Sequence, residues 1–92
     1  MGSLNKEQLS LIREGFELGF TEEEISLYAN TSFSTSKMRF LIDILKKGYS
    51  YDTAKRLSKI NIRKEDYTKI ETMLKNGITA RQIELFAKTS QN

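Results

Sequence analysis

Three glycines stand at a constant spacing of 29 residues, and each is followed by an apolar residue and then by a hydroxyl residue. The three copies read Gly19-Phe20-Thr21, Gly48-Tyr49-Ser50 and Gly77-Ile78-Thr79. Self-similarity at a fixed period of this length is typical of chains that stack copies of one small structural unit. We therefore treat residues 1–92 as a single domain made of repeats 5–33, 34–62 and 63–91. Residues that are 29 positions apart are said below to share a column.

Apolar residues precede each glycine at helical spacing, in the same three columns of every repeat. The columns are Leu9, Met38 and Tyr67; Ile12, Leu41 and Ile70; and Phe16, Leu45 and Leu74. Spacing of i, i+3 and i+7 predicts a helix that is buried along this stripe. The glycine just beyond it is expected to end the helix in a left-handed conformation, with the next apolar residue packing back on the last turn. Gly15 lies inside the first helix, so Gly15→Ala is expected to stabilise the fold unless a neighbouring backbone packs closely there.

A second, shorter helix follows each glycine. Thr21, Ser50 and Thr79 are suited to cap its first turn, and Glu24 or Gln82 completes a capping box in two copies. Its buried side is predicted to hold Ile25, Ala54 and Ile83, with Tyr28, Leu57 and Phe86 three residues later. A single helix–turn–helix hairpin of this kind cannot bury its apolar side alone. We expect an all-α fold of three stacked hairpin repeats with about six helices, a short open α-solenoid-like bundle.

One stretch of the first repeat also resembles a known pattern. It comprises residues 12–20, Ile25, residues 27–30, Phe33 and Met38. These residues resemble an uncharacterised helical-hairpin repeat in proteins of Gram-positive bacteria, phages and mobile elements, approximately IR-x-GLE-x-GL … YA … F … M. The match fades in the second repeat, where Ile44 stands in the column of Gly15. The resemblance implies a setting in which small regulators and inhibitors of host systems are common, and it implies no active-site residue.

The chain contains no cysteine and no histidine. Their absence excludes thiolate zinc sites, Cys–His nucleophile pairs and Ser–His–Asp triads. The best remaining candidate for catalysis or metal binding is the run Glu22-Glu23-Glu24 near Glu14 and Glu17. Acidic residues in a first helical turn are better explained by the positive end of the helix. We expect no enzymatic activity, no cofactor and no metal site.

Charge is distributed unevenly between the repeats. Residues 1–33 hold two basic and six acidic side chains (−4), residues 34–62 hold seven and two (+5), and residues 63–92 hold six and four (+2). A basic zone in the middle suits either a negatively charged protein or a phosphate backbone. The candidate partner-binding residues are Lys37, Arg39, Lys46, Lys47, Lys55, Arg56 and Lys59.

A protein partner is the favoured interpretation, because stacked hairpins present long grooves and end faces. Leu11, Leu18, Leu85 and Phe86 lie near the ends of the stack, where exposed members would act as interface anchors and a homodimer through an end repeat would cover them.

The alternative is a DNA-binding regulator, because residues 74–83 read like the start of a helix-turn-helix motif and the helix beginning near Ser34 would be its recognition element. That helix is apolar on two flanks, which is unfavourable for reading a groove. No apolar run approaches the ~18 residues that a membrane span needs, so we expect no membrane partner and a cytoplasmic location.

Overall fold

The computed structural model describes residues 3–89 and contains three helical hairpins in that range. The predicted third repeat, 63–91, extends two residues beyond the described part, at 90 and 91. Within residues 3–89 there are six α-helices, one short 3₁₀ segment and no strand, so the all-α hairpin fold is confirmed. The helices are α1 (Lys6–Glu17), α2 (Glu22–Tyr28), α3 (Thr35–Lys46), α4 (Tyr51–Ser58), α5 (Tyr67–Lys75) and α6 (Ala80–Thr89), with η1 (Lys64–Asp66) leading into α5.

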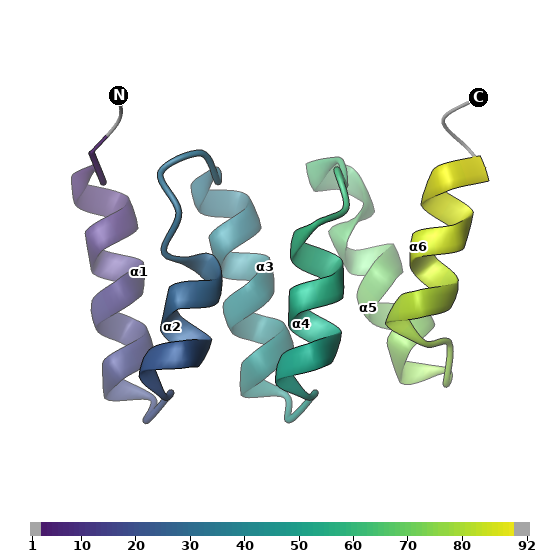
Figure 1. The fold of residues 1–92 in the computed structure, drawn as a ribbon, viewed down its shortest axis with the longest axis horizontal. Helices are drawn as coiled ribbons and strands as arrows, with labels where there is room; N and C mark the ends of the chain where they lie inside the picture. Colours follow the sequence, from purple (N-terminus) through teal and green to yellow (C-terminus); the bar gives the residue numbers. More distant parts are fainter. Residues whose placement is uncertain (1–2, 90–92) are drawn as a thin grey trace.

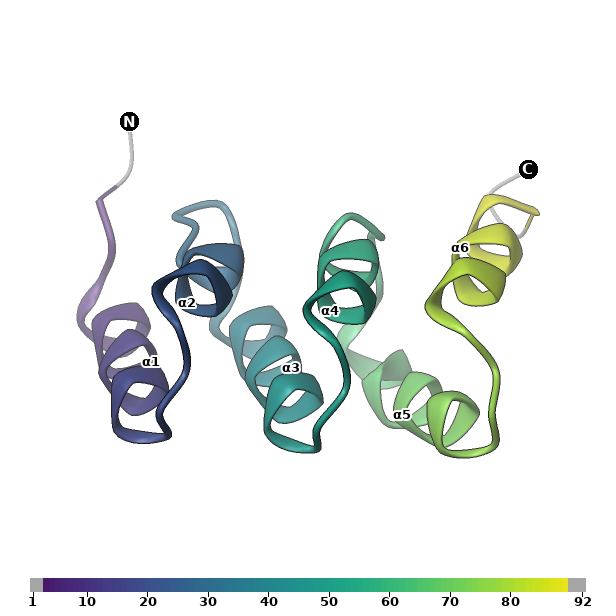
Figure 2. The ribbon, with the colours of Figure 1, turned by 60° about the horizontal axis from the view of Figure 1, so that its bottom comes forward.

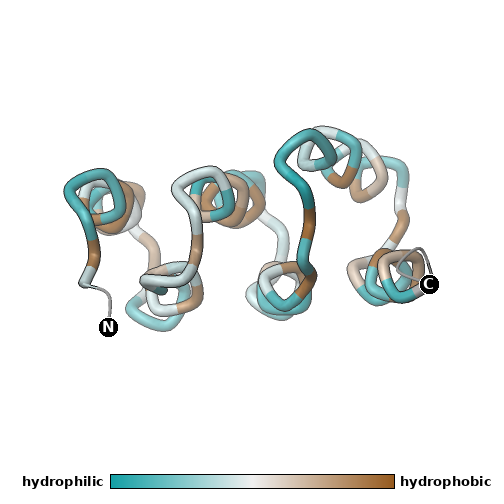
Figure 3. The backbone as a smooth tube through the Cα atoms, turned by 90° about the horizontal axis from the view of Figure 1, so that it is seen from above, coloured by the Kyte–Doolittle hydropathy of each residue, from teal (hydrophilic) through white to brown (hydrophobic). Residues whose placement is uncertain are grey.

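The hairpins stack side by side in the order of the sequence, so that α1 and α6 lie at opposite ends of the stack (Figure 1). The first helices of the hairpins, α1, α3 and α5, form one layer, and α2, α4 and α6 form the other (Figure 2). The molecule measures 34 × 29 × 20 Å. Apolar residues of both layers lie largely on the sides that face each other (Figure 3). The core therefore runs along the stack instead of closing around a centre.

The three glycine turns have the predicted geometry. Gly19, Gly48 and Gly77 have φ of 86°, 94° and 92°. At the first turn the N–H of Phe20 donates to the carbonyl of Gly15 at 3.0 Å and the N–H of Gly19 donates to Phe16 at 3.1 Å. This pair of bonds defines the Schellman motif, which needs a residue in the left-handed region at the glycine position. The same pair recurs at the second and third turns.

The helix caps are also as predicted. Thr21 and Glu24 form a reciprocal capping box, with the Thr21 N–H donating to Glu24 Oε1 at 2.8 Å. Thr79 and Gln82 form the equivalent pair, and Ser50 Oγ accepts the N–H of Thr53 at 3.1 Å. A further capping box, which the sequence patterns above do not include, joins Asn5 to Gln8 at the start of α1.

Helix α3 is the centre of the core. It buries side chains on both flanks, as expected for an element with a neighbour on each side: Met38, Phe40, Leu41, Ile42, Ile44 and Leu45. Its contact with the third repeat includes a stacked ring pair, Phe40 on Tyr67, with centroids 4.5 Å apart.

Helix α1 differs from the prediction. Leu9 and Phe16 were expected in its buried stripe, yet their side chains are 53% and 58% exposed. The helix instead buries Gln8, Leu11 and Gly15. The physical reason is position in the stack. In repeats two and three the stripe is covered by the repeat before, whereas α1 belongs to the first of the repeats that the structure describes.

Candidate interaction surfaces

Arg39, a predicted contact residue, binds the repeat before it. Its guanidinium donates to both carboxylate oxygens of Glu14 on α1, at 2.7 and 2.8 Å. The hydrogen bond from Arg39 holds the pKa of Glu14 below its ordinary value. This bidentate geometry is the strongest form of Arg–carboxylate contact. Arg39 therefore joins the first two hairpins.

Lys47 and Arg56 join the second hairpin to the third through single hydrogen-bonded ion pairs. The ammonium group of Lys47 pairs with Glu71 on α5. Arg56 donates to Glu84 on α6 at 3.1 Å and to Asp52 in its own helix at 3.0 Å. The hydrogen bonds to these carboxylates raise the pKa values of Lys47 and Arg56. Sequence patterns could not reveal the pairs Lys47–Glu71 and Arg56–Glu84, because their partners are 24 and 28 residues apart.

Of the other four predicted residues, two lie near aromatic rings and two are exposed without an ion pair among the described residues. Lys37 Nζ lies 4.2 Å from the ring centroid of Phe33, and burial lowers its pKa. Lys55 Nζ lies 6.0 Å from the ring of Tyr51. Lys46 and Lys59 are exposed, and neither forms an ion pair within the part of the chain that the structure describes.

The basic residues are also spread over both layers. Lys37, Arg39, Lys46 and Lys47 belong to α3 and its C-cap, in one layer. Lys55, Arg56 and Lys59 belong to α4 and its C-cap, in the other layer (Figure 2). The structure thus does not gather the predicted residues on one helix face.

The acidic run does not form a metal centre. Glu22, Glu23 and Glu24 occupy the first turn of α2, where Glu24 completes the cap and Glu14 is engaged by Arg39. Among residues 3–89 no three His, Cys, Asp or Glu side chains come close enough to hold a metal ion. The run is accounted for by its position at the positive end of a helix.

The interior of the first hairpin contains a close contact between Gly15 and Tyr28. Tyr28 is fully buried, its hydroxyl donates to the carbonyl of Leu11 at 3.2 Å, and burial raises its pKa to about 12. A Cβ at position 15 would lie 1.9 Å from the Tyr28 hydroxyl oxygen. A side chain, instead of the neighbouring backbone considered from the sequence, thus fills the space at Gly15. The sequence signal is that the one glycine in this column stands in the repeat that has tyrosine at position 28.

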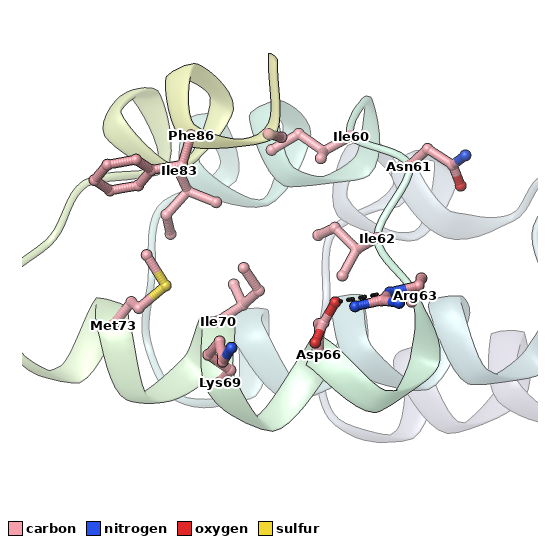
Figure 4. Close-up of a pocket in the computed structure, with 11 residues that line it drawn as sticks. Ile60, Asn61, Ile62, Arg63, Asp66, Lys69, Ile70, Met73, Ile83 and Phe86 are labelled. Atoms are coloured by element: carbon pink, nitrogen blue, oxygen red, sulfur yellow. Dashed lines mark hydrogen bonds and ion pairs between the residues drawn. The ribbon is translucent and has the colours of Figure 1, made fainter. Parts of the chain in front are cut away.

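The third hairpin is more open than the other two. A pocket of about 730 Å³ lies between α5 and α6, and Ile62, Ile70, Met73 and Ile83 point toward it (Figure 4). At one end Arg63 pairs with Asp66 at 3.2 Å. In this hairpin Met73 stands in the column of Gly15 and Ile44, and Phe86 stands in the column of Tyr28 and Leu57.

Large apolar side chains are exposed in both end repeats. They are Leu9, Phe16, Leu18, Leu85 and Phe86, between 41% and 58% exposed. Leu11, also considered from the sequence as an end residue, belongs to the core at 9%.

The recognition helix of the DNA-binding alternative would be α3. Six of its twelve residues are buried, and it lies between the flanking hairpins (Figure 1). A helix enters a major groove by a broad solvent-facing surface. The burial of α3 therefore weakens this alternative.

None of the helices described between residues 3 and 89 has the length and apolar character required to cross a bilayer. A scan against protein-family models, a search of curated proteins and a search of solved structures each gave no match.

Proposed function

We propose that this chain is a non-enzymatic protein-binding module, acting in the cytoplasm as a regulator or inhibitor of the kind encoded by phages and mobile elements. The observation that carries the proposal is the exposure of large apolar side chains at both ends of the stack. Leu9 and Phe16 are more than half exposed, whereas Met38 and Leu45 in the same columns of the middle repeat are 0% and 7% exposed. Clustered apolar and aromatic side chains of this kind dominate protein interfaces.

The charges support a protein partner over a nucleic acid. Arg39, Lys47 and Arg56 are paired with carboxylates of neighbouring repeats, so contact with a phosphate would have to displace these pairs. Of the predicted residues Lys37, Lys46, Lys55 and Lys59 remain, and they are divided between the two layers. Nucleic-acid binding depends on several cations tracking one backbone. We propose that Lys46, Lys55 and Lys59 orient an acidic protein partner and that apolar contacts supply most of the affinity.

The test combines affinity capture with a nucleic-acid binding assay. Wild type, Phe16→Glu, Phe86→Glu and the double change Lys46→Glu with Lys59→Glu are used to capture proteins from the host. We expect a retained protein that is lost when Phe16 or Phe86 is changed and is reduced by the lysine changes.

The competing assay is fluorescence anisotropy with a random DNA duplex at two salt concentrations. Duplex binding that falls steeply with salt and disappears in the double lysine variant would establish the nucleic-acid function and overturn the proposal. A protein retained equally by all four variants would also overturn it, because neither surface would then contribute.

A further inference from the structure

The two sides of each hairpin can be compared column by column, because the repeats share a register of 29 residues. The columns of Leu9, Ile12 and Phe16 face the preceding repeat. In the second repeat these columns hold Met38, Leu41 and Leu45, at 0%, 0% and 7% exposure. In the first repeat Leu9 and Phe16 are 53% and 58% exposed. We call Leu9, Ile12 and Phe16 the leading face.

The opposite side of each hairpin shows the reverse pattern. The columns of Leu11, Gly15 and Tyr28 face the following repeat, and in the second repeat they hold Phe40, Ile44 and Leu57, at 3%, 0% and 0% exposure. In the third repeat the same columns hold Lys69, which is exposed, Met73, which is half-buried, and Phe86, which is 57% exposed. We call Lys69, Met73 and Phe86 the trailing face. The pocket between α5 and α6 opens beside it, lined by Met73 and Phe86 among others (Figure 4).

The two end faces are the two halves of one interface that already occurs twice inside the molecule. Between the second and third repeats, for example, the ring of Phe40 stacks on the ring of Tyr67. Phe40 is in the trailing-face column of Lys69, and Tyr67 is in the leading-face column of Leu9. Transferred to two copies of the chain, this contact places Lys69 of one copy beside Leu9 of the next. The ion pairs between repeats transfer in the same way. The pair Glu14–Arg39 is replaced by Thr72 of one copy beside Ser10 of the next, and the pair Lys47–Glu71 is replaced by Asn76 of one copy beside Arg13 of the next. None of these transferred pairs brings like charges together.

Net charge distinguishes between the possible arrangements of two copies. The first repeat carries −4 and residues 63–92 carry +2, so leading face against trailing face is attractive. An arrangement of leading face against leading face brings together two repeats that each carry a net charge of −4. An arrangement of trailing face against trailing face brings together two repeats that each carry +2. Like charges brought together at an interface disfavour both symmetric arrangements.

The size of the faces sets the strength of the contact. The stack runs along the 34 Å axis, and the other two dimensions of 29 and 20 Å limit each end face to about 600 Å², so a pair would bury at most about 1,200 Å² in total. That area is at the lower limit for a stable interface. Association should therefore depend on concentration.

We propose that copies of this chain associate head to tail, the leading face of one copy seating on the trailing face of the next. This inference deepens the proposed function by naming a second copy as the occupant of the end faces. Because the contact joins two different surfaces, it does not close on a dimer, and chains of copies continue to grow as the concentration rises.

Sedimentation velocity over a concentration series, from low micromolar to millimolar, tests the arrangement. For wild type we expect the mean mass to rise beyond that of a dimer. Phe16→Glu and Phe86→Glu should each be monomeric, and an equal mixture should form a dimer that grows no further, because one good face remains on each variant. The controls are Ser26→Glu in the first repeat and Lys88→Glu in the third, changes of exposed residues in columns that stay partly or fully exposed in every repeat.

Disulfide trapping provides a second test that does not introduce a charge. The chain has no cysteine, so a Leu9→Cys copy and a Lys69→Cys copy can be mixed and oxidised. We expect the mixed pair to become cross-linked at least tenfold faster than Leu9→Cys with Lys75→Cys. Lys75 is exposed on the same helix as Lys69, in a column exposed in all three repeats. Unchanged circular dichroism confirms that each variant is folded.

Three outcomes would overturn the inference. They are a wild type that stays monomeric to millimolar concentration, a mixture of the two phenylalanine variants that stays monomeric, and cross-linking no faster than the control. Loss of association by Phe16→Glu alone, with Phe86→Glu unaffected, would replace it with a symmetric dimer. If self-association fails while Phe16→Glu or Phe86→Glu still abolishes capture of another protein, the proposed function stands and only the identity of the occupant is wrong.

Discussion

Replacement of Gly15 by alanine provides a sharp test of the packing in the first hairpin. Alanine is a better helix former than glycine by about 1 kcal/mol, so helix propensity alone favours the change. The added Cβ, however, would lie 1.9 Å from the Tyr28 hydroxyl and 3.1 Å from Ile25 Cγ1. Tyr28 is fully buried, so its rigid ring has no open space to move into. The ring and its helix must shift together.

The magnitude follows from the contacts that are lost. Overpacking a close-packed core costs about 1–3 kcal/mol. Displacing the hydroxyl from the carbonyl of Leu11, now at 3.2 Å, costs about 1 kcal/mol more. After the gain in helix propensity, we expect Gly15→Ala to lower the free energy of unfolding by about 1–3 kcal/mol. Urea denaturation followed by far-UV circular dichroism measures it.

A double-mutant cycle with Tyr28→Phe isolates the cause. Without the hydroxyl, the nearest ring atom to a Cβ at position 15 is Cζ at 3.2 Å, a contact that a small shift accommodates. Tyr28→Phe alone should cost about 1 kcal/mol, because the Leu11 carbonyl keeps its helical bond. The double variant should be more stable than Gly15→Ala, with a coupling of at least about 1 kcal/mol.

The matched control is Ser10→Ala, an exposed position of the same helix where alanine should stabilise slightly. If Gly15→Ala stabilised the protein as Ser10→Ala does, or if the two changes in the cycle were additive, the packing argument would be refuted.

Four further outcomes are expected. Gly48→Val should lower the free energy of unfolding by about 1 kcal/mol or more in the same urea assay, because φ there is 94° and valine disfavours the left-handed region; an unchanged midpoint would contradict the turn assignment. Ser50→Ala should cost about 1 kcal/mol, because its Oγ accepts the N–H of Thr53, and Thr68→Ala, exposed on α5, is the comparison. Glu14→Gln should lower stability at neutral pH by less than about 1 kcal/mol, since the pair with Arg39 is partly exposed. Because the fold lowers the pKa of Glu14, this difference is present above the ordinary carboxyl pKa and is lost as pH falls through the lowered value, so equal losses at acid and neutral pH would contradict it. Amide hydrogen exchange should be slowest in α3 and faster in α5, which borders the pocket; equal protection in the two helices would show that the third hairpin is closed in solution.

The sequence by itself determined the local architecture of this protein. Positions of the helices, their hydroxyl caps and the three left-handed glycine turns depend on hydrogen bonds between residues at most five positions apart, so the relevant groups stand next to each other in the chain. The predicted stripe was correct for α3 and α5, where Leu41, Leu45, Ile70 and Leu74 are buried. These signals also sufficed for the hairpin stack, because a hairpin with an apolar side must cover it with another.

Tertiary structure alone decided which apolar sides are covered and which charged side chains form ion pairs between repeats. Leu9 and Phe16 follow the same pattern as Met38 and Leu45, yet they are exposed because burial depends on whether another repeat stands alongside. The carboxylates of neighbouring repeats that engage Arg39, Lys47 and Arg56 lie at least 24 residues away, a distance at which no local rule applies. The fit of Gly15 to Tyr28 depends in the same way on the combined size of two side chains that meet only after folding.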